Sequence, residues 1–195
     1  LSQRHGVPVA STSAMTTTDT AALARFLDVF PDWLRTLGED AGALGNVVST
    51  QSNDDVARYV ASGLNYIFKS LDLIPDGIDD LGFCDDAFVL RVAASLACEA
   101  DGASREGVLG RLADEAKQVE EFLEGDYPRL VTYVQGLRKG AARGRTVEDI
   151  MTDASVRSAF VQEVTAWAGE YQVPPFTRDV KTLIKLKAFI SAKLA

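Results

Sequence analysis

The sequence predicts an all-α protein, folded as a compact bundle of about seven or eight helices. Apolar residues recur with a period near 3.6 along most of the 195 residues, as on the buried face of amphipathic helices. No segment repeats the strict apolar–polar alternation that is typical of a half-buried strand. Glycines, prolines and helix-capping residues divide the chain into pieces of helical length.

Two short helices are expected near the start, over residues 19–30 and 31–38. Asp19 is a suitable N-cap for the first helix, because its carboxylate can accept hydrogen bonds from free backbone amides. Pro31 suits the first position of the second helix, where a backbone N–H has no intrahelical partner anyway. Gly38 is expected to end that helix.

The next residues, 39–51, are predicted to form only a weak helix, because Gly42 and Gly45 lower helical propensity. A stronger helix follows, with Asn53 as its expected N-cap. Its buried stripe is predicted to consist of Val56, Val60, Leu64, Ile67 and Leu71.

Three further helices are predicted to begin near residues 85, 104 and 126. Gly102 separates the first from the second, and the pair Gly125-Asp126 separates the second from the third. The three apolar stripes are Phe88, Val89, Val92, Leu96 and Ala100, then Val108, Leu112, Ala116, Val119 and Leu123, then Leu130, Val131, Val134 and Leu137.

The last part of the chain begins with a basic GAARG stretch at 140–144, which is expected to be a flexible linker. Thr146 can cap a short turn, and Asp153 can cap a helix that ends before two consecutive prolines. Thr177 is the expected cap of the final helix. The apolar faces of these two helices are Val156, Phe160, Val164 and Trp167, then Val180, Leu183, Leu186, Ile190 and Leu194.

A single helical domain is therefore expected over residues 19–195, with a possible C-terminal subdomain at 146–195. Residues 1–18 are rich in Ser and Thr and are expected to be a flexible leader or an expression remnant, with Met15 as a plausible native start. They do not resemble a secretory signal, and no run of eighteen apolar residues occurs anywhere. We therefore expect a cytoplasmic location.

Composition excludes several classes of protein. A chain that is 47% hydrophobic and 25% charged is too apolar to be wholly disordered. A net charge of −8 argues against a nucleic-acid partner, since phosphate neutralisation dominates that affinity. The only histidine, His5, lies in a polar tail, so catalytic or zinc sites built on histidine are not expected. Cys84 and Cys98 share one predicted helix, which would hold them about 21 Å apart as free thiols.

One segment, Ser70–Asp86, fits neither an ordinary helix nor an ordinary loop, because six carboxylates alternate in it with five large apolar residues. The aspartates are Asp72, Asp76, Asp79, Asp80, Asp85 and Asp86, and the apolar residues are Leu73, Ile74, Ile78, Leu81 and Phe83. We expect this connector to bury its apolar side chains in the bundle. Its carboxylates would then face backbone amides, water or a cation.

The connector resembles the bacterial YkvA-type domain, a family of unknown function with a D-L-I-P-D motif followed by G-x-x-D-D. The match covers about residues 60–94, around an expected core at 53–101, and departs from the family pattern at Ser70, Gly77 and Asp79. The resemblance implies a small helical domain, which in some members is attached to membrane or ubiquitin-ligase proteins. It implies no established chemistry.

Three roles for the aspartates stay open. Structural capping is favoured, because Asp85 and Asp86 stand where a helix should begin. A divalent-cation site formed by the six aspartates is an alternative, since Mg²⁺ and Ca²⁺ prefer carboxylate oxygens. An EF-hand is excluded, because Ile74 would occupy a ligand position and Phe83 would replace the final glutamate. A partner-docking or catalytic role is the third.

The final helix is basic, in contrast to the rest of the chain. Residues 178–195 carry five basic side chains and one acidic one, a net charge of +4, which leaves −12 on the remainder. Its lysines are expected to be solvated or to face the acidic body. Alternatively, this amphipathic helix could lie on an anionic membrane surface or enter a partner's groove, and Phe189 on its basic face favours that alternative.

The function expected from the sequence is a non-enzymatic interaction or adaptor module, built around the connector and binding a protein partner. No Walker A, Rossmann, G-x-S-x-G or S-x-x-K motif occurs. The sequence thus favours a role without catalysis and leaves an enzymatic one open. The alternatives are a divalent-cation site with possible hydrolytic activity, and peripheral membrane association through residues 178–195.

Overall fold

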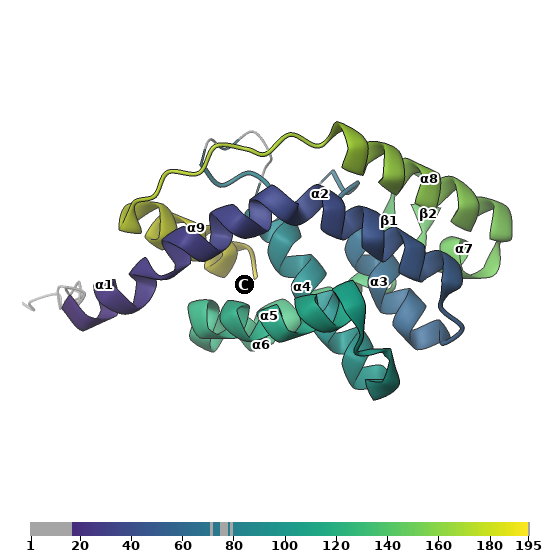
Figure 1. The fold of residues 1–195 in the computed structure, drawn as a ribbon, viewed down its shortest axis with the longest axis horizontal. Helices are drawn as coiled ribbons and strands as arrows, with labels where there is room; N and C mark the ends of the chain where they lie inside the picture. The colour runs from purple at the N-terminus through teal and green to yellow at the C-terminus, as the bar shows by residue number, and fades with distance from the viewer. Residues whose placement is uncertain (1–16, 71, 75–77, 79, 195) are drawn as a thin grey trace, which may run out of the picture.

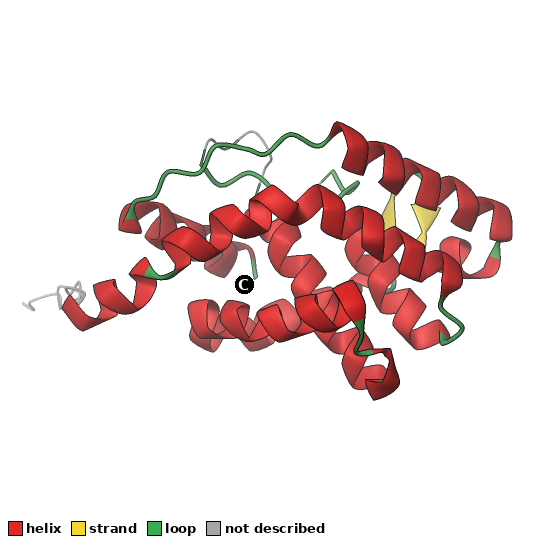
Figure 2. Ribbon diagram, viewed as in Figure 1, coloured by secondary structure: helices red, strands yellow, loops and turns green. Residues whose placement is uncertain are grey.

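The prediction of an all-α fold is confirmed by a computed structural model that describes residues 17–70, 72–74, 78 and 80–194. Figure 2 shows these residues as helices joined by loops, with one very small sheet. The helices are α1 (Thr17–Ala24), α2 (Phe26–Thr50), α3 (Asp54–Tyr66), α4 (Cys84–Ala100), α5 (Gly107–Leu123), α6 (Tyr127–Leu137), α7 (Val147–Thr152), α8 (Ala154–Glu170) and α9 (Val180–Lys193), and two 3₁₀ turns are η1 (Gly102–Ser104) and η2 (Glu124–Asp126).

The helix α2 differs from the prediction, because it is one continuous helix of 25 residues. The sequence predicted a boundary at Pro31, a stop at Gly38 and only a weak helix beyond. Pro31 lies near the start of α2, where it removes a single backbone hydrogen bond. The helix continues because its next turns bury Leu37, Ala41 and Leu44 in the core. Tertiary packing thus overrides the local signals.

The glycines of α2 have a packing role that explains why they stand in a helix. Figure 1 shows α8 running alongside α2. A Cβ atom at Gly38 would lie 3.0 Å from the carbonyl oxygen of Ala168 and 3.1 Å from the ring of Tyr171. At Gly45 it would lie 3.4 Å from a methyl group of Val164. The glycines therefore let α8 approach closely.

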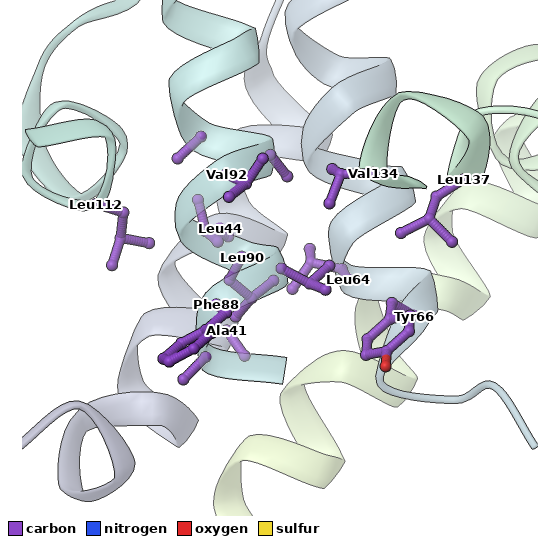
Figure 3. Packing of buried hydrophobic residues seen from close by; sticks show 14 of the residues in the cluster. Ala41, Leu44, Leu64, Tyr66, Phe88, Leu90, Val92, Leu112, Val134 and Leu137 are labelled. Atoms are coloured by element: carbon purple, nitrogen blue, oxygen red, sulfur yellow. The ribbon is translucent and has the colours of Figure 1, made fainter. Parts of the chain in front are cut away.

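The core lies where α2 to α6 meet. Figure 3 shows side chains from these helices pointing toward one another, with Leu44 on α2, Leu64 on α3, Leu90 on α4 and Val134 on α6 among them. The predicted stripes of these helices supply much of the core. Cys84 and Cys98 are both free and buried on α4, as predicted. One cluster of buried apolar side chains extends from Phe26 to Ile190 and includes residues of α7, α8 and α9; whether 146–195 folds as a subdomain stays a prediction.

Several predicted caps are confirmed. The side chains of Asn53 and Asp153 accept hydrogen bonds from the first amides of α3 and α8. Thr146 forms a capping box with Asp149 at the start of α7. The cap of α9 is Asp179 rather than Thr177, because the Thr177 hydroxyl instead donates to a carboxylate in the connector.

The GAARG stretch is a tight hairpin and not a flexible linker. Strand β1 (Ala141–Ala142) pairs antiparallel with β2 (Arg145–Thr146). The two residues between the strands, Arg143 and Gly144, have φ values of 49° and 79°. Such left-handed values at both turn positions are typical of two-residue hairpin loops.

Candidate functional site

The Asp-rich connector joins the end of α3 at Tyr66 to the start of α4 at Cys84. Four of the six candidate aspartates lie in the part of the connector that the structure describes: Asp72, Asp80, Asp85 and Asp86. The other two, Asp76 and Asp79, lie outside the described residues.

Asp85 is fully buried and ties the connector to both flanking helices. Its Oδ2 accepts a hydrogen bond of 2.6 Å from the Tyr66 hydroxyl and one of 2.9 Å from the amide of Ile74. The same hydroxyl accepts a bond of 2.7 Å from the amide of Leu73. Three backbone or hydroxyl donors are thus satisfied by two buried side chains. This arrangement holds the connector against the bundle.

The other described aspartates have different surroundings. Asp86 is buried, Asp72 is half-buried, and Asp80 accepts a 2.7 Å hydrogen bond from the hydroxyl of Thr177, in the loop that leads to α9. Asp80 and Phe83 have φ values of 75° and 61°. Left-handed backbone at two non-glycine residues is held by the packing around them.

The expected capping role of Asp85 and Asp86 needs a correction. Helix α4 begins at Cys84, one residue before the expected start, so both aspartates lie within its first turn. The N-cap position is Phe83, whose side chain makes no capping hydrogen bond. Negative charge in a first turn is still favourable, because it faces the positive end of the helix dipole.

The cation-site alternative gains no support from the described part of the connector. Within residues 17–70, 72–74, 78 and 80–194, no group of three Asp, Glu, Cys or His side chains is placed to hold a metal ion. Asp85 directs an oxygen at backbone and hydroxyl donors. With Asp76 and Asp79 outside the described residues, the cation site stays a prediction.

Burial shifts the acid–base properties of groups around Asp85. It raises the pKa of the Tyr66 hydroxyl far above the usual range, and the negative charge of Asp85 acts in the same direction. Burial likewise raises the pKa of the Cys84 thiol. Both groups are therefore neutral near pH 7. A neutral buried thiol is a poor nucleophile.

A second polar cluster, which the sequence did not reveal, lies between α2, α4 and α5. Arg91 is completely buried on α4, with its guanidinium 3.9 Å from the ring centre of Trp33. It forms an ion pair of 2.7 Å with Glu115 and lies 3.8 Å from Asp40. Arg111 pairs with the same two carboxylates. Burial lowers the pKa of Arg91 to about 10, which leaves it charged at neutral pH.

This ionic cluster could not be predicted, because its members lie far apart in the sequence. Two guanidinium groups and two carboxylates leave no net charge, and the Thr36 hydroxyl adds a bond of 3.0 Å to Asp40. Balanced, hydrogen-bonded charges of this kind are what a buried position requires. The cluster is therefore a structural link between three helices.

A groove of about 630 Å³ lies on another side of the molecule, between the α1–α2 junction, the end of α5 and α9. Its walls are mainly apolar: Leu23 and Phe26 on one side, and Leu183, Ile184 and Ala188 on α9. Figure 1 shows α9 packed beside the first part of α2. Ile184 is 43% exposed, which is unusual for a large apolar side chain on a helix that closes a core.

Charged pairs border this groove. Arg25 pairs with Glu121, and Lys187 pairs with Glu124 at 2.6 Å. Both pairs join helices that are distant in the sequence and thus fix the width of the groove. Because such exposed pairs contribute little to stability, their main effect is on the shape and charge of the rim.

The surface of α9 is divided much as its sequence pattern predicted. Leu183, Leu186 and Ile190 are completely buried, and Lys181 and Lys185 are exposed. Other residues depart from the pattern. Phe189 is half-buried against the core instead of standing free on the basic face. Among the described residues, no helix is long and apolar enough to cross a membrane.

No protein-family model matches the chain, and neither a curated protein nor a solved structure is significantly similar to it. The resemblance of the connector to the YkvA-type domain thus rests on its motif and stays a prediction.

Proposed function

We propose that the protein is a non-enzymatic interaction module, which binds an amphipathic helix of a protein partner in the groove between α9 and the α1–α2 junction. The observation that carries this proposal is the exposed Ile184 at the edge of a mainly apolar groove. A contiguous apolar depression with a charged rim is typical of surfaces that another protein covers.

The shape of the groove favours a helix as its occupant. Helix α9 forms one wall, and the end of α1 and the first residue of α2 form another, with Glu124 and Asp126 of η2 also lining the groove. An added helix would pack its apolar stripe on Leu23, Ile184 and Ala188, as helices do in a bundle.

The charge on the α9 side of the groove favours acidic residues on that side of the stripe, whereas Glu121, Glu124 and Asp126 line the opposite side. Lys181 and Lys185 project from α9 next to Ile184, and the segment 178–195 carries a net charge of +4. Acidic side chains on the partner helix would lie near these lysines and increase the rate of association. The rest of the chain has a net charge of −12, so the charge distribution favours an approach of acidic side chains from the α9 side.

Site-specific photo-cross-linking tests the proposal. A photoreactive phenylalanine analogue replaces Ile184 in the groove, and in a control protein it replaces Val173, which is 53% exposed outside the groove. In cells that naturally express the chain, position 184 should capture one discrete protein. The purified partner should then bind the unmodified chain.

The proposal requires that the analogue at position 184 captures a protein that the analogue at position 173 does not capture. Equal cross-linking at positions 173 and 184 would show general stickiness of exposed apolar groups. Capture of lipid in place of protein at position 184 would instead support the membrane alternative.

A further inference from the structure

A small basic hollow lies at the β-hairpin, far from the groove in the fold. It has a volume of about 260 Å³ and is lined by Lys69 and Ser70, in the first part of the connector, and by Ala141, Ala142, Arg143 and Gly144 of the hairpin. Figure 1 shows the hairpin between α8 and α3.

Arg143 is held in place before any ligand binds. Its guanidinium lies 4.7 Å from the ring centre of Phe68 and pairs with Glu163 of α8. The same ring contacts Arg145 at 5.3 Å, and Arg145 pairs with the same carboxylate. The two arginines therefore enclose one aromatic ring and share one acidic partner.

Lys69 is held by different contacts. Its ammonium group donates a hydrogen bond of 2.9 Å to the Tyr133 hydroxyl and lies 5.1 Å from the centre of that ring. Contacts with an aromatic ring and a phenol orient a cation but do not neutralise it.

The charge balance at the hollow is positive on a strongly acidic protein. Lys69 and Arg143 supply two positive charges to the lining of the hollow, and Arg145, beside the hollow, shares the single negative charge of Glu163 with Arg143. The whole chain has a net charge of −8. The excess of positive charge at this hollow, on a protein that is otherwise acidic, favours the binding of an anion.

We propose that this hollow binds the phosphate group of a small phosphomonoester. Phosphate carries the two negative charges that the hollow lacks, and it accepts the several hydrogen bonds that a guanidinium, an ammonium and a hydroxyl can donate together. Ser70 also lines the hollow, and its hydroxyl can donate a third hydrogen bond. The small volume restricts the organic part of the ligand to a few atoms.

Nuclear magnetic resonance titration of the full chain tests this proposal. Glycerol 3-phosphate and inorganic phosphate are added in separate experiments, with sodium chloride adjusting each sample to the same ionic strength. Saturable shifts are expected at the amides of Ser70 and Ala141–Gly144, with a millimolar or lower dissociation constant. Tighter binding of the ester would identify a phosphomonoester site, and equal affinity for both would overturn the organic part of the proposal.

The variants Lys69→Met and Arg143→Gln should each weaken binding at least tenfold. Lys117→Met is the matched control, since Lys117 is an exposed lysine on α5 that is not among the residues lining the hollow, and it should bind as the unmodified chain does. Unchanged spectra outside the hairpin would show that each variant is folded. Unsaturable shifts, or equal affinity in all variants, would overturn the proposal.

Discussion

The hydroxyl of Tyr66 donates a 2.6 Å hydrogen bond to the buried carboxylate of Asp85, across the connector that separates α3 from α4. Each of these two side chains also accepts a hydrogen bond from a connector amide. The Tyr66 hydroxyl accepts from the amide of Leu73, and the Asp85 carboxylate accepts from the amide of Ile74. A motif that could have been read as a set of metal ligands therefore contains at least one carboxylate with a structural role. The connector is part of the packed fold, held by two side chains.

The Tyr66→Phe variant is expected to be less stable by about 1–3 kcal/mol, because it leaves the buried Leu73 amide without its acceptor and removes one of the donors to the buried carboxylate of Asp85. Urea unfolding followed by circular dichroism measures this loss. Tyr59→Phe is the control, since Tyr59 is only half-buried and accepts a bond from Arg138 near the surface. Equal losses in both variants would contradict a special role for Tyr66.

The stability contributed by Tyr66 should depend on pH only in alkaline solution. The pKa of its hydroxyl is raised above the ordinary value of 10.0, so the folded protein keeps a proton that the unfolded chain releases. Its contribution is therefore complete below about pH 10 and is lost as pH rises further. The difference in unfolding free energy between the unmodified chain and Tyr66→Phe should narrow by at most about 1.4 kcal/mol per pH unit above 10.

Measurements at pH 8, 9, 10 and 11 would check this dependence. The lowered pKa of Arg91 acts in the same alkaline range with the opposite sign, but it is common to both proteins and cancels in the difference. If the difference in unfolding free energy between the unmodified chain and Tyr66→Phe stayed constant from pH 8 to pH 11, the raised pKa of Tyr66 in the folded protein would be contradicted.

The Arg91→Met variant should lose about 3–5 kcal/mol, because Asp40 and Glu115 would lose the buried guanidinium and keep only the partly exposed Arg111 as their cationic partner. Arg35→Met is the matched control. Arg35 pairs with Asp32 on the exposed side of α2, and its loss should cost no more than about 1 kcal/mol. Chemical unfolding of both variants gives the comparison, and similar losses would disprove the importance of the buried cluster.

The Gly63→Ala variant should be destabilised by about 1–3 kcal/mol through overpacking. A Cβ atom at Gly63 of α3 would lie only 2.8 Å from the Cβ atom of Ala93 on α4. Gly136→Ala in α6, where a Cβ atom would meet nothing within 4 Å, should instead gain up to about 1 kcal/mol from helical propensity. Thermal unfolding would show the opposite shifts, and shifts of the same sign would contradict the packing.

The fold class and many helix ends were predictable because they depend on short-range physics. Asn53, Thr146 and Asp153 each satisfy amides two or three residues away, so their role is visible in the local sequence. The apolar stripes of α3 to α6 follow from helical periodicity in the same way. These features need no knowledge of distant residues.

The predictions that were wrong concern features that are decided by contacts between residues far apart in the sequence. The α2 glycines lower helical propensity, yet they are retained in a long helix because α8 packs against them. The hairpin at Arg143 is ordered by Phe68 and Glu163, which come from other parts of the chain. Likewise, nothing near Arg91 in the sequence indicates that Asp40 will face it.

The proposed helix-binding groove is tested most directly by the affinity of the cross-linked partner for three purified proteins: the unmodified chain, Ile184→Glu and Val173→Glu. Both variants place one negative charge at an exposed apolar position, but only Ile184 lines the groove. Calorimetric titration should show at least tenfold weaker binding to Ile184→Glu and unchanged binding to Val173→Glu. Equal affinity for all three proteins would contradict the proposed function.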